Sequence, residues 1–402
     1  MDFKIPESFN DFEELKLRAE TLRGIYGYGW EKPSEIQKQA LVPFLNNNDM
    51  IIQACAGSGK TGVFGIGSIE KVKSNIKNMQ VLIISPTREL SVQTYNIICT
   101  IAQYSPISVA LHRGCSTKLR TGEKLSGTER ASGYMSYGES QRYCEQIVVA
   151  TPGRILDLFR RKQISCNTLS LLILDEADEL LTLSNEFQTT LKDILSFLPV
   201  ERQTIVVSAT IPSDVLSFVQ NITNSPKRLL MKNEELPLAG IKQYYVVLEK
   251  EQDKILCLID IYSNISIQQS IIFVNRKEKV DYICEQMREN GFTVSCIYGT
   301  MSQVERDSIM ADFRKGVTRV LIATDLLARG IDVQSVSMVF NYDLPNNKEN
   351  YIHRIGRSGR YGRKGVAVNF VLEPSGNKPK SVIELENFYG CQISPLPQLD
   401  LL

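Results

Sequence analysis

The feature that most constrains the fold is an apolar run followed almost at once by a glycine-rich turn. Met50–Ile52 is followed, one residue later, by Ala54–Thr61, which reads Ala-Cys-Ala-Gly-Ser-Gly-Lys-Thr. A strand that ends in such a turn and continues into a helix points backbone N–H groups at one spot, which suits a triphosphate. Lys60 would then reach the β- and γ-phosphates, and the Thr61 hydroxyl would ligate Mg²⁺.

The first position of this turn departs from the general phosphate-loop pattern, which places glycine where this chain has Ala54. A chance Gly-Lys-Thr turn is therefore the alternative interpretation. The rest of the sequence has to decide between the two, because a nucleotide site also needs a sheet beneath the loop and acidic side chains beside it.

Composition narrows the class of protein. The 402 residues suffice for two domains of ordinary size, and 43% hydrophobic with 23% charged residues is typical of globular chains. The net charge of +1 excludes a global basic field, although a nucleic-acid groove needs only local charge.

Cysteine and histidine usage argues against a structural metal or a disulfide framework. The nine cysteines form no Cys-x-x-Cys pair and there are two histidines, which favours a reducing compartment. No apolar run approaches about 18 residues, and the N-terminal segment is not basic and then hydrophobic, so we expect neither secretion nor a membrane span.

Short apolar runs alternate with helical stretches along the first half of the chain. Such alternation predicts a parallel sheet with crossover helices, and continuous apolar strands imply that both faces are covered. A helix is expected over Leu15–Tyr28, and a glycine- and serine-rich surface insertion at about 115–146. The expected strands are Val81–Ser85, Ile107–Leu111, Ile147–Ala150, Leu171–Leu174 and Ile205–Ser208.

The alternation restarts after a break at about Pro226 to Gly240. We therefore predict two α/β domains, at 1–228 and 241–402, joined by a linker at 229–240. The expected helices of the second are Asp253–Tyr262, Glu278–Asn290 and Ser302–Lys315. Its expected strands are Tyr244–Leu248, Ser270–Val274, Thr293–Tyr298, Val320–Ala323 and Met338–Tyr342.

A pair of acids follows one of the most apolar strands. Leu171–Leu174 runs directly into Asp175 and Glu176. Ligands bind at the carboxyl ends of parallel strands, so these acids should lie beside the phosphate loop. Asp175 would order Mg²⁺, and Glu176 would orient and deprotonate the attacking water. The alternative is an acidic helix start that complements the helix dipole.

Gln37 follows a helix-start signal at Pro33 and Ser34. A glutamine amide can donate and accept in one plane, which matches the N6 and N7 edge of adenine and would select ATP. The alternative is a solvated glutamine on a helix surface.

Arginines are concentrated near the end of the second domain. His353–Arg360 reads His-Arg-Ile-Gly-Arg-Ser-Gly-Arg and is followed by Arg363 and Lys364. Guanidinium groups neutralise phosphoryl oxygens with two hydrogen bonds at once. The cluster is therefore either a general anion patch or a set of fingers that reach ATP held by the first domain.

Together these segments resemble the ordered motif set of the DEAD-box RNA helicases. The alanine at position 54 agrees with that family. Two further segments, Leu22–Gly29 and Tyr342–Asn347, are similar to translation initiation factor 4A and its exon-junction paralogue. The segments that carry the family resemblance are Gly29–Gln37, Ala54–Thr61, Pro86–Leu90, Thr151–Arg154, Asp175–Asp178, Ser208–Thr210, Ala323–Asp332 and His353–Arg360.

The resemblance implies two tandem RecA-like domains, each a mostly parallel sheet with helices on both faces, and ATP with Mg²⁺ as cofactors. Phe12, with Phe9 as a nearby rival, would stack on adenine, and Asp332 would touch the ribose. Thr61 and Asp175 would hold Mg²⁺, partly through water. The implied catalytic residues are Lys60, Asp175, Glu176, Arg357 and Arg360. The implied nucleotide contacts are Phe12, Trp30, Pro33, Gln37, Ala56, Gly57, Ser58, Gly59, Lys60, Thr61, Gly330, Asp332, Arg357 and Arg360.

The resemblance also implies sequence-independent binding of single-stranded RNA or a short RNA duplex. The implied RNA contacts are Thr87, Arg88, Thr151, Arg154, Asn275, Gln303, Arg306 and Thr324. Asp178, Ser208 and Thr210 would couple hydrolysis to RNA contact, while His353 and Arg354 would tie the domains together. Arg113, Arg276 and Thr300 depart from the family pattern. Arg113 replaces one of two paired glycines, Arg276 a small hydroxyl residue, and Thr300 an aspartate.

The implied activity is ATP-dependent unwinding of short RNA duplexes in translation initiation. The chain would act in the cytoplasm as a monomer, with a scaffold protein of the initiation complex as partner. The alternative is a nuclear, ATP-locked RNA clamp in a splicing or exon-junction complex.

Overall fold

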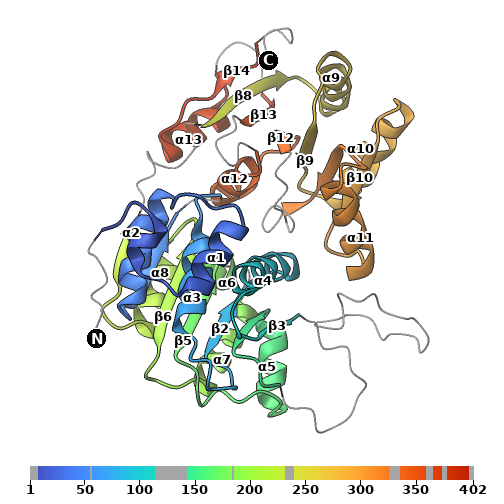
Figure 1. Ribbon diagram of the computed structural model, residues 1–402. Helices are drawn as coiled ribbons and strands as arrows, with labels where there is room; N and C mark the ends of the chain where they lie inside the picture. Colours follow the sequence, from blue (N-terminus) through green and yellow to red (C-terminus); the bar gives the residue numbers. More distant parts are fainter. Residues whose placement is uncertain are drawn as a thin grey trace, which may run out of the picture. The chain divides into compact units, whose positions relative to one another are not determined.

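The computed structural model describes residues 8–54, 57–113, 143–182, 185–230, 240–325, 336–358, 365–373 and 378–397. The chain divides into two compact units, the first extending to Leu230 and the second starting at Met231. Within the described residues, each unit contains one seven-stranded sheet (Figure 1).

The first sheet pairs its strands in parallel, in the order β3-β4-β2-β5-β6-β1-β7. Parallel neighbours need crossover connections, which helices provide. The strands are β1 Met50–Gln53, β2 Val81–Ile84, β3 Val109–His112, β4 Ile147–Ala150, β5 Leu171–Asp175, β6 Gln203–Ser208 and β7 Lys227–Leu230. The helices are the 3₁₀ helix η1 Phe12–Leu15, then α1 Ala19–Gly27, α2 Glu35–Leu45, α3 Lys60–Lys71, α4 Arg88–Ala102, α5 Pro152–Arg160, α6 Ala177–Thr182, α7 Asn185–Phe197 and α8 Ser213–Ile222.

Both faces of the first sheet are buried because its central strands are apolar at successive positions. Leu172 and Leu174 of β5 belong to a core that packs against α5, α6, α7 and α8. The alternate residues Leu171 and Ile173 point to the opposite face and are also fully buried. Helices α1 to α4 contact one another and cover that second face.

The five strands expected in the first domain are confirmed to within two residues. Strand β4 has the predicted bounds, and β6 begins at Gln203 rather than Ile205. The expected helix from Leu15 begins later, at Ala19. The cause is the left-handed backbone of Lys16, with φ 52°, which ends η1 and interrupts the helical path.

Strand β7 was not expected, because it follows Pro226 and begins with Lys227 and Arg228. It pairs with β1 at the edge of the sheet, and its side chains are mostly exposed. An edge strand with charged side chains carries no apolar pattern, since only its backbone has to pair. The first unit therefore extends beyond the expected break at about Pro226.

The second sheet is also parallel, in the order β10-β11-β9-β12-β13-β8-β14. Its strands are β8 Ile241–Leu248, β9 Gln269–Phe273, β10 Val294–Ile297, β11 Val320–Ala323, β12 Val336–Asn341, β13 Gly365–Leu372 and β14 Ser394–Pro395. Its helices are α9 Glu251–Asn264, α10 Lys277–Glu289, α11 Gln303–Arg314, α12 Lys348–Ile355 and α13 Lys380–Tyr389.

Helices again cover both faces of this sheet. A core on one face joins α9 and α10 to the sheet through residues such as Ile272 and Phe340. On the other face, α11 packs around Phe273 and Leu321, and α12 and α13 pack around Ala367. The expected fold of two tandem RecA-like domains, each a parallel sheet between helices, is confirmed.

The helices and strands predicted for the second domain end at Tyr342. The structure adds four elements after that residue that the sequence analysis did not predict: α12, β13, α13 and β14. Strand β13 lies between β12 and β8 in the sheet. Its sequence, from Gly365 to Leu372, is an apolar run of the kind that predicts the other strands.

None of the helices in the described part of the chain combines the length and the apolarity that a bilayer crossing requires.

We expect Gly24→Ala to lower the free energy of unfolding of the first unit by about 1–3 kcal/mol. A Cβ atom on Gly24 would lie 1.8 Å from the backbone oxygen of Ile101, so α1 would have to move away from α4. The matched control is Gly27→Ala on the same helix. Its Cβ would meet the flexible Gln103 side chain at 3.2 Å. Denaturant unfolding followed by circular dichroism measures the difference, and equal midpoints for the two variants would contradict this packing.

Candidate functional site

The carboxyl edge of the first sheet brings together the predicted segments of the first domain. The strand order β4-β2-β5-β6-β1 places the end of β5 at the centre of this edge. The glycine-rich turn follows β1, and Ser208 ends β6. On the other side of β5, Thr87 and Thr151 follow β2 and β4. Parallel pairing thus separates the predicted ATP residues from the predicted RNA residues along one edge, with Asp175 between them.

The glycine-rich turn adopts a backbone that only glycine accepts readily. Gly57 and Gly59 have φ of 80° and 101°, in the left-handed region. Gly59 is the N-cap of α3, so Lys60 is its first residue and the first N–H groups of the helix face the turn. A helix start of this kind suits an anion, and Thr61 is its second residue. Ala56 lies outside the described residues.

Gln37 contacts this turn directly. Its amide oxygen accepts from the Ser34 N–H at 2.9 Å, and its amide nitrogen donates to the Gly59 carbonyl at 3.3 Å. Gln37 is 3% exposed, so the alternative of a solvated glutamine is wrong. A Cβ on Gly62 would lie 2.3 Å from the Gln37 amide nitrogen and 2.8 Å from the Trp30 ring. The start of α2 is therefore packed against the phosphate loop.

The two aromatic candidates for adenine stacking are both buried. Phe12 lies in η1 and has no exposed surface, and Phe9 is 3% exposed. Their rings belong to the apolar core of the first unit. The stacking role of Phe12 stays a prediction, as does the contact expected from Pro33.

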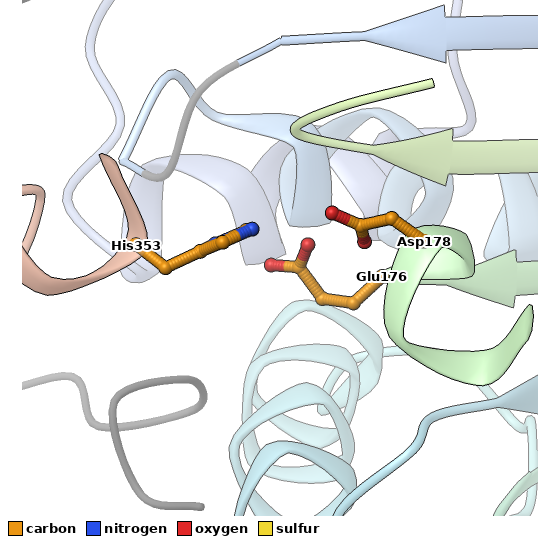
Figure 2. A group of neighbouring side chains, drawn as sticks. All are labelled: Glu176, Asp178 and His353. Atoms are coloured by element: carbon orange, nitrogen blue, oxygen red, sulfur yellow. The ribbon is translucent and has the colours of Figure 1, made fainter. Parts of the chain in front are cut away.

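The acids at the end of β5 are held by the backbone around them. Asp175 is the last residue of β5, and its Oδ1 accepts from the Glu176 N–H at 3.1 Å. Glu176 has a φ of 48°, which is unusual for a residue with a side chain and is a form of local strain found at functional sites. Figure 2 shows the carboxylates of Glu176 and Asp178, which come from the turn after β5 and the start of α6.

The carboxyl group of Asp175 is buried with little compensation for a negative charge. Burial and the neighbouring charge of Glu176 raise its pKa to about 8, although Lys60 acts in the opposite direction. Its Oδ2 is buried and makes no hydrogen bond within the part of the chain that the structure describes. Lys60 is 7% exposed and donates to the Ala54 carbonyl. A buried carboxylate oxygen without a hydrogen bond is the kind of ligand that a divalent cation takes.

Asp178, Ser208 and Thr210 form one hydrogen-bonded network. The Asp178 N–H donates to Ser208 Oγ at 3.2 Å, and Thr210 Oγ1 donates to Asp178 Oδ2 at 2.7 Å. Ser208 Oγ donates in turn to the Thr210 carbonyl at 2.7 Å. The acidic segment after β5 is thereby joined to the end of β6. The three residues lie next to one another, as their shared coupling role requires, and that role stays a prediction.

The RNA residues predicted in the first domain lie at helix N-termini. Thr87 is the N-cap of α4, and its Oγ1 accepts from the Leu90 N–H at 3.2 Å. Arg88 is the first residue of α4, and Thr151 is the N-cap of α5. Because β2 and β4 are neighbours, the two helix starts lie side by side and present positive dipole ends suited to phosphate.

Arg154 and His112 border these helix starts. Arg154 forms an ion pair with Asp157 at 2.9 Å. His112 ends β3, is 6% exposed, and lies with its ring edge to face against Tyr143 at a centroid distance of 4.6 Å. Burial, aided by the charge of Arg154, lowers the pKa of His112 to about 4. His112 belongs to none of the sequence motifs, so no role for it could be predicted from the sequence.

Asn275 in the second unit is held by groups that the sequence did not identify. It follows β9, and its side-chain oxygen accepts from the buried Arg354 at 2.8 Å. Arg354 also donates to the Asp343 carbonyl at 2.6 Å and forms an ion pair with Asp325. These contacts of Arg354 lie within the second unit and orient Asn275.

Asp343 holds the backbone of Asn275. Its Oδ2 accepts from the Asn275 N–H at 3.1 Å, and its Oδ1 lies 3.0 Å from Lys254 Nζ and 2.7 Å from Lys279 Nζ. Burial alone would raise the pKa of Asp343, but the hydrogen bonds from Lys279, Asn275 and Lys254 outweigh it and lower the pKa. Lys254 and Lys279 lie on two different helices, so no sequence motif links them to this site.

The remaining predicted residues of the second unit are only partly described. Thr324 follows β11, which pairs with β9, and Gln303 and Arg306 lie on the first turn of α11. Arg357 Nε donates to the His353 carbonyl at 2.9 Å, just after α12. Arg276 is the N-cap of α10, and Thr300 precedes α11. Gly330, Asp332, Arg360 and most of the 115–146 insertion lie outside the described residues.

Comparisons with known proteins find relatives over nearly the whole chain. The family model described as DEAD/DEAH box helicase matches residues 34–218, and the helicase conserved C-terminal domain matches residues 253–362. The ATP-dependent RNA helicase eIF4A of Kluyveromyces lactis is 46% identical over 96% of this chain and 92% of its own length. The ATP-dependent RNA helicase fal1 of Schizosaccharomyces pombe is 44% identical over 96% of this chain and 93% of its own.

A similar solved structure is that of Dbp5 of S. cerevisiae bound to RNA and ADP BeF3. It is 33% identical, with a TM-score of 0.85, over 96% of this chain and 95% of that chain. A DEAD box protein of Methanococcus jannaschii is 31% identical, with a TM-score of 0.53, over 97% of this chain and 100% of that chain.

We expect His112→Phe to reduce the loss of stability on acidification. The folded pKa of His112 lies below its unfolded value of 6.5, so the stabilising contribution of the neutral ring is present above about pH 6.5 and is lost as the pH falls towards 4. Between pH 7 and pH 5 the wild type should lose on the order of 1 kcal/mol more than the variant. Denaturant unfolding at both pH values measures this. An identical pH dependence of the two proteins would show that His112 does not titrate as described.

Proposed function

This chain belongs to the DEAD/DEAH box helicase family, and on that premise we propose that it is an ATP-dependent RNA helicase that separates short RNA duplexes in translation initiation. The observation that carries the proposal is the carboxyl edge of the first sheet. There the phosphate loop, the acids after β5 and two helix N-termini follow neighbouring strands. The proposed sites for ATP and for a phosphate backbone would then share one edge of the sheet.

The ATP chemistry follows from the residues at that edge. The N–H groups at the start of α3 would hold the phosphates, and Lys60 would neutralise the β- and γ-phosphates. Thr61 and Asp175 would hold Mg²⁺, which would relieve the unfavourable burial of the Asp175 charge and polarise the γ-phosphate. Glu176 would orient the attacking water and accept its proton. Gln37, already bonded to Gly59, would link recognition of adenine to the shape of the phosphate loop.

RNA binding would depend on the backbone of the nucleic acid rather than on its bases. Thr87 and Thr151 cap neighbouring helices, whose N-termini favour phosphate oxygens. Asn275, Gln303, Arg306 and Thr324 are proposed to contact the strand from the second unit. Short polar and basic groups of this kind follow phosphates and 2′-hydroxyls without reading sequence.

Coupling between the two sites is proposed to pass through Asp178, Ser208 and Thr210. Their hydrogen bonds join the segment that carries Glu176 to the end of β6. Arg357 and Arg360 are proposed as arginine fingers that complete the site for hydrolysis. A site assembled from residues of both units would turn over ATP slowly until RNA engages them as well.

The role in initiation is proposed over a nuclear RNA clamp because relatives named as eIF4A or as eukaryotic initiation factor 4A match nearly the whole chain at 43–46% identity. We further propose that the protein acts in the cytoplasm, as a monomer that docks on a scaffold protein of the initiation complex.

The first test compares ATP hydrolysis with and without single-stranded RNA. We expect RNA to raise kcat about tenfold or more, and a strand-displacement assay to show unwinding that needs ATP. Lys60→Ala should abolish both activities by removing the cation that meets the phosphates. Lys71→Ala, at the other end of α3, is the matched control and should retain both. Equal hydrolysis with and without RNA would contradict the proposed coupling.

A second test addresses the biological role. Affinity purification of the tagged chain from its cells, followed by mass spectrometry, should recover a scaffold and other factors of the initiation complex. The Lys60→Ala variant serves as the comparison, because partners that bind only the ATP-loaded form should be lost from it. Recovery of splicing or exon-junction proteins in place of initiation factors would favour the clamp.

A further inference from the structure

Two cysteines line one surface pocket in the second unit, and none of the residues assigned to ATP or RNA lines it. Cys284 lies on α10 and is 2% exposed, whereas Cys296 lies on β10 and is partly exposed. Strand β10 is at the edge of the second sheet, and α10 packs against it (Figure 1). Cys296 packs on the core cluster to which Cys284 belongs.

The two thiols line the same pocket and differ in exposure, since Cys284 is buried and Cys296 is partly exposed. The neighbouring thiol of Cys284 and the positive charge of Arg288 lower the pKa of Cys296 despite its burial. The neighbouring thiol of Cys296 and burial raise the pKa of Cys284. Arg288 is held in place by a hydrogen bond from its Nη2 to the Val294 carbonyl at 3.2 Å. Cys296 is the more exposed of the two thiols and lines the pocket with Arg288, so it is the thiol that a reagent from solvent meets first.

A surface pocket gives small reagents access to this pair. The pocket has a volume of about 430 Å³ and is lined by Asp281, Cys284, Glu285, Arg288, Glu289 and Cys296. Most of the lining residues recur at helical spacing along one side of α10, so the pocket lies between that helix and the edge strand. A partly exposed nucleophilic thiol with a second, buried thiol behind it is the arrangement that favours disulfide formation over further oxidation.

We propose that Cys284 and Cys296 form a peroxide-sensitive dithiol that closes reversibly into a disulfide between α10 and β10. The Cys296 thiolate attacks one oxygen of hydrogen peroxide, the O–O bond breaks, and the departing hydroxide takes a proton to become water. Cys296 is then a sulfenic acid. The Cys284 sulfur attacks the Cys296 sulfur, the S–O bond breaks, and a second water leaves with the Cys284 proton. Two thiols lose two electrons in total, which reduce one peroxide to two waters.

This modification does not depend on the proposed helicase function. A disulfide between Cys284 and Cys296 would link α10 covalently to β10 at the edge of the sheet. The N-terminus of α10 follows Asn275, and β10 leads to α11, which carries Gln303 and Arg306. The disulfide would thus restrict the segments that flank the proposed RNA contacts of the second unit.

The test uses the full chain treated with hydrogen peroxide, blocked with N-ethylmaleimide and digested with trypsin. Cleavage after Arg288 places the two cysteines in separate peptides, so a disulfide appears as one linked pair of peptides. We expect this pair in the wild type and its disappearance after dithiothreitol. Absence of the pair at peroxide concentrations that oxidise any other cysteine of the chain would overturn the proposal.

Matched variants separate the two thiols. In Cys284→Ser, Cys296 should accumulate as a sulfenic acid trapped by dimedone, because its partner is missing. In Cys296→Ser, Cys284 should remain reduced. Cys257→Ser on α9 is the control, since burial and Asp260 raise the pKa of that thiol to about 11, and it should form the disulfide as the wild type does. In the reduced wild type at pH 7, iodoacetamide should alkylate Cys296 at least about tenfold faster than Cys257. Equal rates would also overturn the proposal.

Discussion

The site of the first unit depends on the parallel pairing of β5 with β2 on one side and β6 on the other. Parallel strands bring all their carboxyl ends to one edge, and segments distant in the sequence become neighbours there. Asp175 pairs in register with Val207, one residue before Ser208, and Leu174 pairs with Ile84, shortly before Thr87. A chain with the same motifs but another strand order would separate them.

Each unit contains a buried aspartate, and the two aspartates differ in the positive groups that surround them. Asp343 in the second unit is surrounded by two lysines and a backbone N–H, so its charge is compensated and its pKa is lowered. Burial, and after it the nearby charges of Glu176 and Asp178, raise the pKa of Asp175 in the first unit, although Lys60 acts in the opposite direction. A compensated buried carboxylate serves to hold structure, whereas an uncompensated one is ready for a cation. Asn275 is held by Asp343, which is a compensated carboxylate of this structural kind, and by Arg354.

Much of the fold could be predicted from the sequence, because apolar strands buried on both faces leave a strong pattern. The five expected strands of each unit are present, with ends displaced by a few residues at most. The failures have physical causes. The edge strand β7 is exposed and charged, and it pairs through its backbone alone. The helix expected from Leu15 is delayed because Lys16 adopts a left-handed backbone.

The sequence by itself determined the candidate chemical groups of this protein: the glycines, lysine and threonine of the predicted phosphate loop, the acids after a buried strand, and the arginines of the second domain. These are local features, since each requires particular residues at a fixed spacing. Only the tertiary structure decided which of them meet. It bonded Gln37 to Gly59, joined Asp178 to Ser208 and Thr210, placed Lys254 and Lys279 around Asp343, and brought Cys284 and Cys296 to one pocket. Except for the last, these pairs join residues far apart in the sequence, and packing alone brings such residues together.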